Sequence, residues 1–196
     1  MTPGTAERPQ MPIEDFEELA SVAPEHVRLE FVDGRVRTKD PLSVEDFEEL
    51  ERRAPETVRL EYVNGKLEVK AMPDGNHRSI HVWLVRQFLL QRPDLDLVPE
   101  SGVKAEAYRK GRARTDAALA PVDHFRGHGE WSETDGILLA LEITSHDRDN
   151  NTLTVFSEPK DGRYHQSVSY PWGDTVQLPS PVDITLDTEK LKDYAD

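Results

Sequence analysis

Two acidic residues stand inside apolar segments of the sequence. Glu142 lies within GILLALEIT, residues 136–144, and Asp116 lies within ARTDAALA, residues 113–120. Both segments are short, apolar and bounded by turn residues, which is typical of strands. A carboxylate inside such a segment needs an explanation, because ionised groups are almost never buried without a partner.

If the two strands are neighbours, Asp116 and Glu142 lie close together on one face of a sheet. Two nearby carboxylates repel each other, which raises the pKa of one of them or requires a cation. A hard divalent ion such as Mg²⁺ (or Mn²⁺) takes oxygen ligands. The sequence therefore predicts a metal site. The alternatives are a solvated strand-end acid at position 116 and a buried acid paired with an arginine at position 142.

Histidines are weaker candidates for a metal site. His77 and His81 are four residues apart, which places them on one helical face at a spacing found in zinc sites. The intervening Arg78 replaces the glutamate of a His-Glu-x-x-His motif, so a zinc hydrolase is the less favoured alternative to packed or surface histidines. His124 and His128 share the spacing, but the glycines around them favour a loop.

Further charged residues are candidates for lining the site. Glu61 is either a third acid beside the metal or an outward-facing hairpin residue. A basic run between residues 104 and 114 is suited to phosphate contacts, although such runs are usually solvated turns. Lys104 and Arg114 are the members of this run that would supply positive charge to the site; the others are Arg109, Lys110 and Arg112.

Composition limits the class of protein. The 196 residues contain 36% hydrophobic and 32% charged side chains, and the apolar residues come in blocks, so one core with an appendage is expected. The absence of cysteine fits a reducing cytoplasm. We expect neither a signal peptide nor a membrane span. The net charge of −14 counts against non-specific nucleic-acid binding, which depends on phosphate neutralisation by Lys and Arg.

The N-terminal part of the chain contains an internal repeat. Residues 13–39 align with residues 44–70 at an offset of 31, and 16 of the 27 pairs are identical. Each copy predicts an acidic helix, an Ala-Pro-Glu loop and a hairpin that turns at Asp-Gly or Asn-Gly, the strongest short hairpin signals. Ser43 is suited to cap the second helix. We expect the second copy to occupy the core, because it is continuous with the remaining chain.

Downstream of the repeat, strands and helices alternate. Apolar residues at helical spacing predict a deeply packed helix over residues 76–91, with Val82, Val85, Leu89 and Leu90 widening its apolar face. The other expected elements are strands at 101–108, around Asp116 and around Glu142, a charged turn at 145–151, a hairpin at 152–157 and 164–170, a strand at 181–186 and a helix at 188–194.

Four segments in this order carry a family resemblance: LEYVNGK (60–66), PDGNH (73–77), RTD (114–116) and LEITS (141–145). From about residue 43 to residue 196, the chain resembles the Uma-two family of restriction endonucleases, a branch of the PD-(D/E)xK nuclease superfamily. The resemblance implies a mixed α/β fold with a central mixed sheet and flanking helices. It also implies Mg²⁺ held by Asp116 and Glu142, His77 near the site, DNA as substrate, and compatibility with a homodimer.

The chain departs from the family pattern in two places. Thr115 replaces the proline before the aspartate. After Glu142, family members continue into a helix with a lysine and a tyrosine and then a core strand, and these are missing here. We therefore divide the chain into a duplicated segment, residues 1–41, and an incomplete nuclease-like domain, residues 42–196. The resulting hypotheses are a Mg²⁺-dependent DNA endonuclease and an inactive relative that serves as an interaction module or is a degenerate product.

Overall fold

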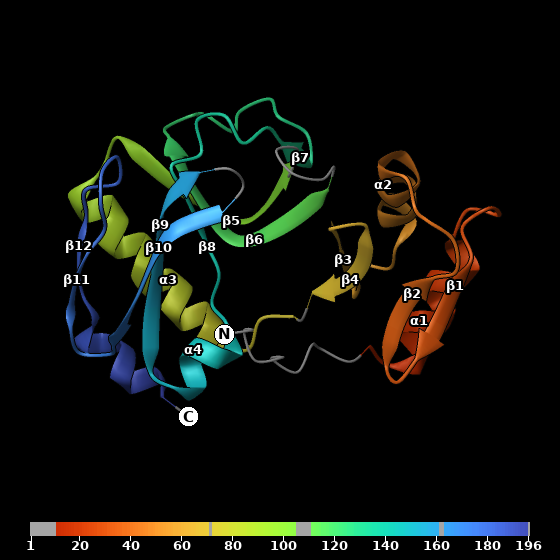
Figure 1. The fold of residues 1–196 in the computed structure, drawn as a ribbon, viewed down its shortest axis with the longest axis horizontal. Helices are drawn as coiled ribbons and strands as arrows, with labels where there is room; N and C mark the ends of the chain where they lie inside the picture. The colour runs from red at the N-terminus through yellow and green to blue at the C-terminus, as the bar shows by residue number, and fades with distance from the viewer. Residues whose placement is uncertain (1–10, 71, 105–110, 161–162, 196) are drawn as a thin grey trace. The chain divides into compact units, whose positions relative to one another are not determined.

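A computed structural model describes residues 11–70, 72–104, 111–160 and 163–195 (Figure 1). The chain forms two compact units. The first comprises Met1–Met72 and Gly102–Arg114, and the second comprises Pro73–Ser101 and Thr115–Asp196. Strands β5 (Leu95–Lys104) and β6 (Arg112–Pro121) each pass from one unit into the other. The repeat boundary at residue 41 lies inside the first unit, and residues 42–196 as a separate domain remain a prediction.

The first unit contains both copies of the repeat, and each copy folds as the sequence predicts. The first copy forms α1 (Ile13–Val22), β1 (Leu29–Val32) and β2 (Arg35–Thr38). The second forms α2 (Val44–Arg53), β3 (Arg59–Val63) and β4 (Lys66–Lys70).

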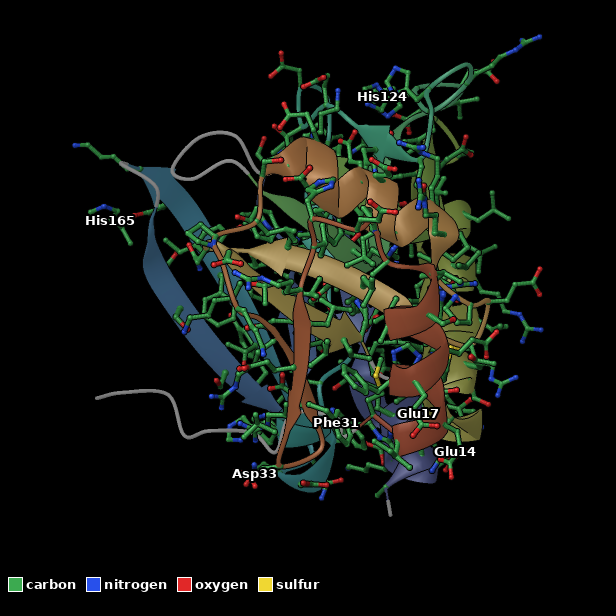
Figure 2. The ribbon with its side chains drawn as sticks, turned by 90° about the vertical axis from the view of Figure 1, so that its right-hand side faces the viewer. Glu14, Glu17, Phe31, Asp33, His124 and His165 are labelled. Carbon is green, nitrogen blue, oxygen red and sulfur yellow. The ribbon has the colours of Figure 1, made fainter. Side chains whose placement is uncertain are left out.

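The hairpin turns of the two copies have the same backbone conformation. Asp33 and Gly34 have φ values of 51° and 73°, and Asn64 and Gly65 have values of 55° and 76°. Two consecutive positive φ angles define the turn that matches strand twist, and Asn, Asp and Gly adopt them readily. Figure 2 shows Asp33 at the turn of the first hairpin, and Glu14 and Glu17 on the exposed side of α1.

Only the second copy joins a larger sheet. Its strand β3 pairs with β4 and also with the start of β6, where Tyr62 faces Arg112. Strands β1 and β2 pair with each other as a separate two-stranded sheet. This arrangement agrees with the expectation that the second copy takes the core position.

The second unit is built around α3 (Gly75–Gln91) and the strands β5 and β6. Strand β6 lies between β5 and β8 in this unit, and β7 lies beside β5. The remaining elements are β7 (Trp131–Ser132), β8 (Leu139–Leu141), α4 (Ser145–Asp149), β9 (Thr152–Lys160), β10 (Arg163–Pro171), β11 (Thr175–Gln177), β12 (Thr185–Asp187) and the 3₁₀ helix η1 (Thr188–Tyr194).

The predicted elements of this part are largely present. The hairpin forms with longer strands than expected, and Val168 faces Val155 across it. The strand predicted at 101–108 begins earlier, at Leu95, and its described part ends at Lys104. The rest of the predicted strand, and the basic residues Arg109 and Lys110, lie outside the described residues. Residues 145–149 form the short helix α4 instead of the expected turn, because Thr144 caps its first amides.

The core of the second unit uses one face of α3. The buried residues at helical spacing pack against β6 and the C-terminal segment. They are Ile80, Trp83, Leu84 and Phe88, with Leu119, Trp172, Val176, Ile184, Leu186 and Leu191.

The prediction that Val82, Leu89 and Leu90 deepen the packing of this helix is wrong. Their side chains are 50%, 60% and 79% exposed. A helix packed on one side buries a single stripe at i, i+3, i+4 spacing, and residues outside that stripe face solvent whatever their polarity.

The protein has a mixed α/β fold with a central mixed sheet and flanking helices, as predicted. Within the described residues, no helix is both long and apolar enough to traverse a lipid bilayer.

Candidate functional site

Asp116 is a buried acid in the middle of β6, with 8% of its surface exposed. Its Oδ2 accepts a hydrogen bond from the backbone N–H of Ile143 at 2.6 Å and lies 3.0 Å from Nε2 of His77. Asp116 therefore joins β6 to α3 and to the segment after β8. The buried carboxylate is held in a defined orientation from two directions.

His77 is itself positioned by the beginning of α3. The N-cap residue Asp74 accepts the backbone N–H of His77 at 2.8 Å through Oδ1. Its Oδ2 accepts a hydrogen bond from Nη1 of Arg148, on α4, at 2.6 Å. The N–H of His77, followed by the Arg148 guanidinium, lowers the pKa of the Asp74 carboxyl. A continuous chain of contacts thus runs from Arg148 through Asp74 and His77 to Asp116.

Glu142 follows the last residue of β8. The antiparallel register places Ala117 opposite Leu141, so its continuation by one residue places Asp116 opposite Glu142. The side chain of Glu142 is exposed, and the expectation that it is buried in an apolar strand is wrong. The reason is that β8 ends at Leu141 and the chain turns into the helix capped by Thr144.

The segment after Glu142 forms a capped short helix instead of the longer helix of the family pattern. Thr144, two residues after Glu142, accepts the N–H of Asp147 at 3.0 Å and donates its hydroxyl to Oδ2 of the same residue at 2.8 Å. Helix α4 has five residues, SHDRD, and β9 begins at Thr152. The segment therefore contains neither the lysine nor the tyrosine of the family pattern.

His77 and His81 lie one turn apart on α3. Nδ1 of His77 and Nε2 of His81 are buried, and neither has a hydrogen-bond partner among the described residues. Burial, followed by the neighbouring His77, lowers the pKa of His81 and favours its neutral imidazole. The described residues contain no group of three or more His, Cys, Asp or Glu arranged to hold a metal ion, so a ready zinc site is absent from this part of the chain.

The other predicted lining residues belong to the first unit. Oε1 of Glu61 accepts the backbone N–H of Arg114 at 2.8 Å, and the Arg114 guanidinium pairs with Glu51. Nζ of Lys70 donates to the carbonyl oxygen of Arg114 at 2.5 Å. Lys104, at the end of β5, is half-buried. In this unit, Glu61 and Arg114 hold β6 in place against the second repeat copy.

Asp116 and Glu142 suit a divalent ion by their chemistry. Mg²⁺ usually takes one or two carboxylates and keeps several waters, so it does not require a third protein ligand. Mn²⁺ also accepts carboxylates and water and binds imidazole more readily. Two of the residues that organise this site, Asp74 and Arg148, were not predicted. The N-cap position of Asp74, three residues before His77, was the local signal available for one of them.

A family model matches the larger part of the chain. The family model described as "Uma2: Putative restriction endonuclease" matches residues 44–150, more than half of the chain. This match begins at the first residue of α2 and ends just after α4. No match was found among curated proteins.

A solved structure has a similar fold. It is described as a "putative nuclease belonging to DUF820" from Anabaena variabilis ATCC 29413, with a TM-score of 0.55 and 18% sequence identity. The alignment covers 80% of this chain and 100% of that one. Because the family model matches residues 44–150, the chain belongs to the Uma2 family of nuclease-like proteins.

Proposed function

We propose that this protein is a metal-dependent endonuclease that hydrolyses DNA phosphodiester bonds, with Asp116 and Glu142 as the ligands of Mg²⁺ or Mn²⁺. The proposal rests on the contact between β6, which carries Asp116, and the segment that follows β8, which carries Glu142. The buried carboxylate of Asp116 accepts the N–H of Ile143, and Glu142 is the residue immediately before it. A bound metal would lower the pKa of a water and neutralise charge on the phosphate.

The protein's own side chains supply orientation. The His77 ring and the Ile143 amide fix Asp116, which reduces the reorganisation needed when a cation binds. Arg148 fixes Asp74, which in turn fixes the backbone at His77. Because Glu142 is exposed, it can reach both an ion and a substrate strand in solvent. Arg148 is the positive charge that follows Glu142 most closely in the sequence, and we assign it a positioning role through Asp74.

Specific observations favour a second candidate, an inactive nuclease-fold protein that acts as an interaction module. Helix α4 is short and contains no lysine. Oδ2 of Asp116 already contacts both His77 and Ile143. The net charge of −14 weakens attraction to DNA.

Nicking of supercoiled plasmid, with Mg²⁺, Mn²⁺ or chelator, separates the two candidates. Asp116→Asn and Glu142→Gln remove one proposed ligand each, and Asp135→Asn, an exposed loop acid, is the matched control. The endonuclease hypothesis expects metal-dependent nicking that either ligand change abolishes and the control retains. Nicking that persists in both ligand variants contradicts the site.

Thermal unfolding with and without metal tests binding separately from catalysis. A ligand that binds only the folded state adds about 2.7 kcal/mol of stability at a hundredfold excess over its Kd. A metal-dependent rise in Tm that disappears in Glu142→Gln, without any nicking, would identify the inactive relative. A sharp transition indifferent to metal would remove the proposed ion from the site.

A further inference from the structure

The two repeat copies contact each other through equivalent residues. Nε2 of His26, in the first copy, lies 2.8 Å from Oδ1 of Asp46 in the second. The hydroxyl of Thr57, in the second copy, donates to Oδ1 of Asp15 in the first at 3.3 Å. At the offset of 31, position 26 corresponds to 57 and position 15 corresponds to 46. The same contact is therefore made twice. In one case the first copy supplies the residue after the Ala-Pro-Glu loop and the second copy supplies the helix aspartate, and in the other case these roles are exchanged.

Equivalent elements meet in the same reciprocal way. Helix α1 packs against α2, and β2 packs against β4, the second strand of the other hairpin. The internal packing of the copies also corresponds, because Phe16 stacks on Phe31 as Phe47 stacks on Tyr62. In an interface with two-fold symmetry, residue i of one partner contacts residue j of the other, and residue j of the first contacts residue i of the second. The two repeat copies have this property.

We propose that the first repeat copy is an internal substitute for a second protein molecule. The second copy has a self-complementary face that includes α2, β4, Asp46 and Thr57, and the first copy occupies this face within the same chain. The full-length protein is therefore monomeric at this surface. When the first copy is displaced, the face accepts the second copy of another identical chain, and a two-fold dimer forms.

The contact chemistry favours the internal partner over the second molecule. In a dimer of second copies, each Thr57 would face Asp46 of the other chain. Both of these contacts would be hydrogen bonds from a neutral hydroxyl to a carboxylate. In the single chain, His26 replaces one of these threonines, and its Nε2 lies 2.8 Å from Oδ1 of Asp46, a closer contact than the 3.3 Å between the Thr57 hydroxyl and Oδ1 of Asp15. The short connection between β2 and α2 also makes the internal contact intramolecular, which corresponds to an effective concentration of roughly millimolar.

The arrangement also covers an exposed strand edge. Strand β4 is at one end of its sheet and pairs with β3 on its inner side. Unpaired edges present backbone donors and acceptors to other chains, so a cover over such an edge opposes uncontrolled association. Because β2 packs along β4, the first copy provides this cover.

Two pairs of cysteines test the internal contact in the full-length chain. The sequence has no cysteine, so His26→Cys/Asp46→Cys and Asp15→Cys/Thr57→Cys each contain one reactive pair. A short bis-maleimide should link each pair within a single chain at micromolar protein concentration. Light scattering should give the monomer mass for the unmodified protein. Links that form between chains instead of within one chain would overturn the proposal and indicate a swapped dimer.

Displacement of the first copy tests the hidden face. Leu19→Asp places a charge at a fully buried position of α1, whereas the second copy keeps its sequence. This full-length variant should shift from the monomer mass to twice that mass. Adding Asp46→Cys/Thr57→Cys should then give links between chains, and the same two cysteines with Leu19 intact should give none. A folded Leu19→Asp variant that stays monomeric contradicts the proposal. If that variant fails to fold, His26→Asp, which places a second carboxylate against Asp46 at an exposed contact, should give the same shift in mass, and a monomer there contradicts the proposal equally.

Discussion

Equivalent residues in the two repeat copies have different partners. In the first copy, Nζ of Lys39 lies 3.3 Å from Oε1 of Glu30, and both side chains are nearly half exposed. In the second copy, Glu61 and Lys70 occupy the same positions, but they bind the backbone N–H and C=O of Arg114 on β6. The same two residue types thus form a surface ion pair in one place and hold a central strand in the other.

The difference between the two copies comes from strand β6, which lies beside the second copy, rather than from their own sequences. Glu48 pairs with Arg112 of β6, whereas its counterpart Glu17 lies on the exposed side of α1 (Figure 2). An exposed ion pair contributes about 0–1 kcal/mol, and a hydrogen bond to a charged group contributes about 1.5–3 kcal/mol. Near-identical local sequences therefore specify the same elements, and tertiary contacts determine how much each copy stabilises the protein.

The largest expected effect comes from the buried leucine of each helix. Leu19 and Leu50 occupy equivalent positions, and both are fully buried. Each change to alanine should cost about 2–5 kcal/mol in the unit of folding that contains it, because a cavity remains. In urea denaturation followed by circular dichroism, Leu50→Ala should lower the midpoint of the main transition, and Leu19→Ala should lower it less. Equal shifts would contradict the difference between the copies.

The lysine pair gives the next largest contrast. Lys70→Met removes the donor to the Arg114 carbonyl oxygen and should destabilise the protein by about 2 kcal/mol, within the range for a charge-assisted hydrogen bond. Lys39→Met breaks only an exposed ion pair and should change the free energy of unfolding by less than about 1 kcal/mol. Chemical denaturation of both variants measures the difference, and a larger loss for Lys39→Met would reverse the argument.

Helix capping distinguishes the copies more modestly. Ser43 accepts the N–H of Asp46 at 3.0 Å, whereas α1 begins after Pro12 without a side-chain cap. Ser43→Ala should therefore cost about 1 kcal/mol. Pro12→Ser supplies the missing hydroxyl and should stabilise α1. Thermal unfolding of the two single variants and the double variant tests both effects.

The smallest effect is a dependence of stability on pH. The hydrogen bond from His26, followed by that from Ser43, lowers the pKa of the Asp46 carboxyl. A carboxyl with a lowered pKa stabilises the folded state above its unfolded pKa of about 3.9, and this contribution disappears as pH falls through the folded value. Asp46→Asn should flatten the Tm profile in this acidic range. Asp15→Asn, at the equivalent position, is the control and should leave the slope attributable to Asp46 intact.

Local features of the fold could be predicted from the sequence. Each repeat hairpin forms at its Asp-Gly or Asn-Gly turn, and Ser43 caps α2, because these structures depend on a few adjacent residues. Periodicity overestimates how much of α3 is buried, because it gives the width of the apolar stripe on the helix but not the number of elements that pack over it. Leu90 therefore lies largely in solvent.

The candidate site was predictable only in part. The strand pairing that brings residue 142 beside β6 follows from the order of the apolar segments, but the exposure of Glu142 depends on where β8 ends. The contacts of Asp116 with His77 and of Asp74 with Arg148 join residues far apart in the chain. No local pattern encodes such contacts; the packing of α3 and α4 creates them.

The Asn64-Gly65 turn also makes the second copy susceptible to chemical ageing. Glycine leaves the following backbone nitrogen accessible for attack on the asparagine side chain, and the resulting succinimide opens to aspartate or isoaspartate. Aspartate is compatible with the backbone conformation of this turn, since Asp33 occupies the equivalent position with nearly the same φ. Isoaspartate adds a backbone carbon to a two-residue turn and would loosen the hairpin that pairs with β6. Storage of the protein at mildly alkaline pH, followed by peptide mapping, should show deamidation at Asn64, and Asn64→Asp should protect the fold.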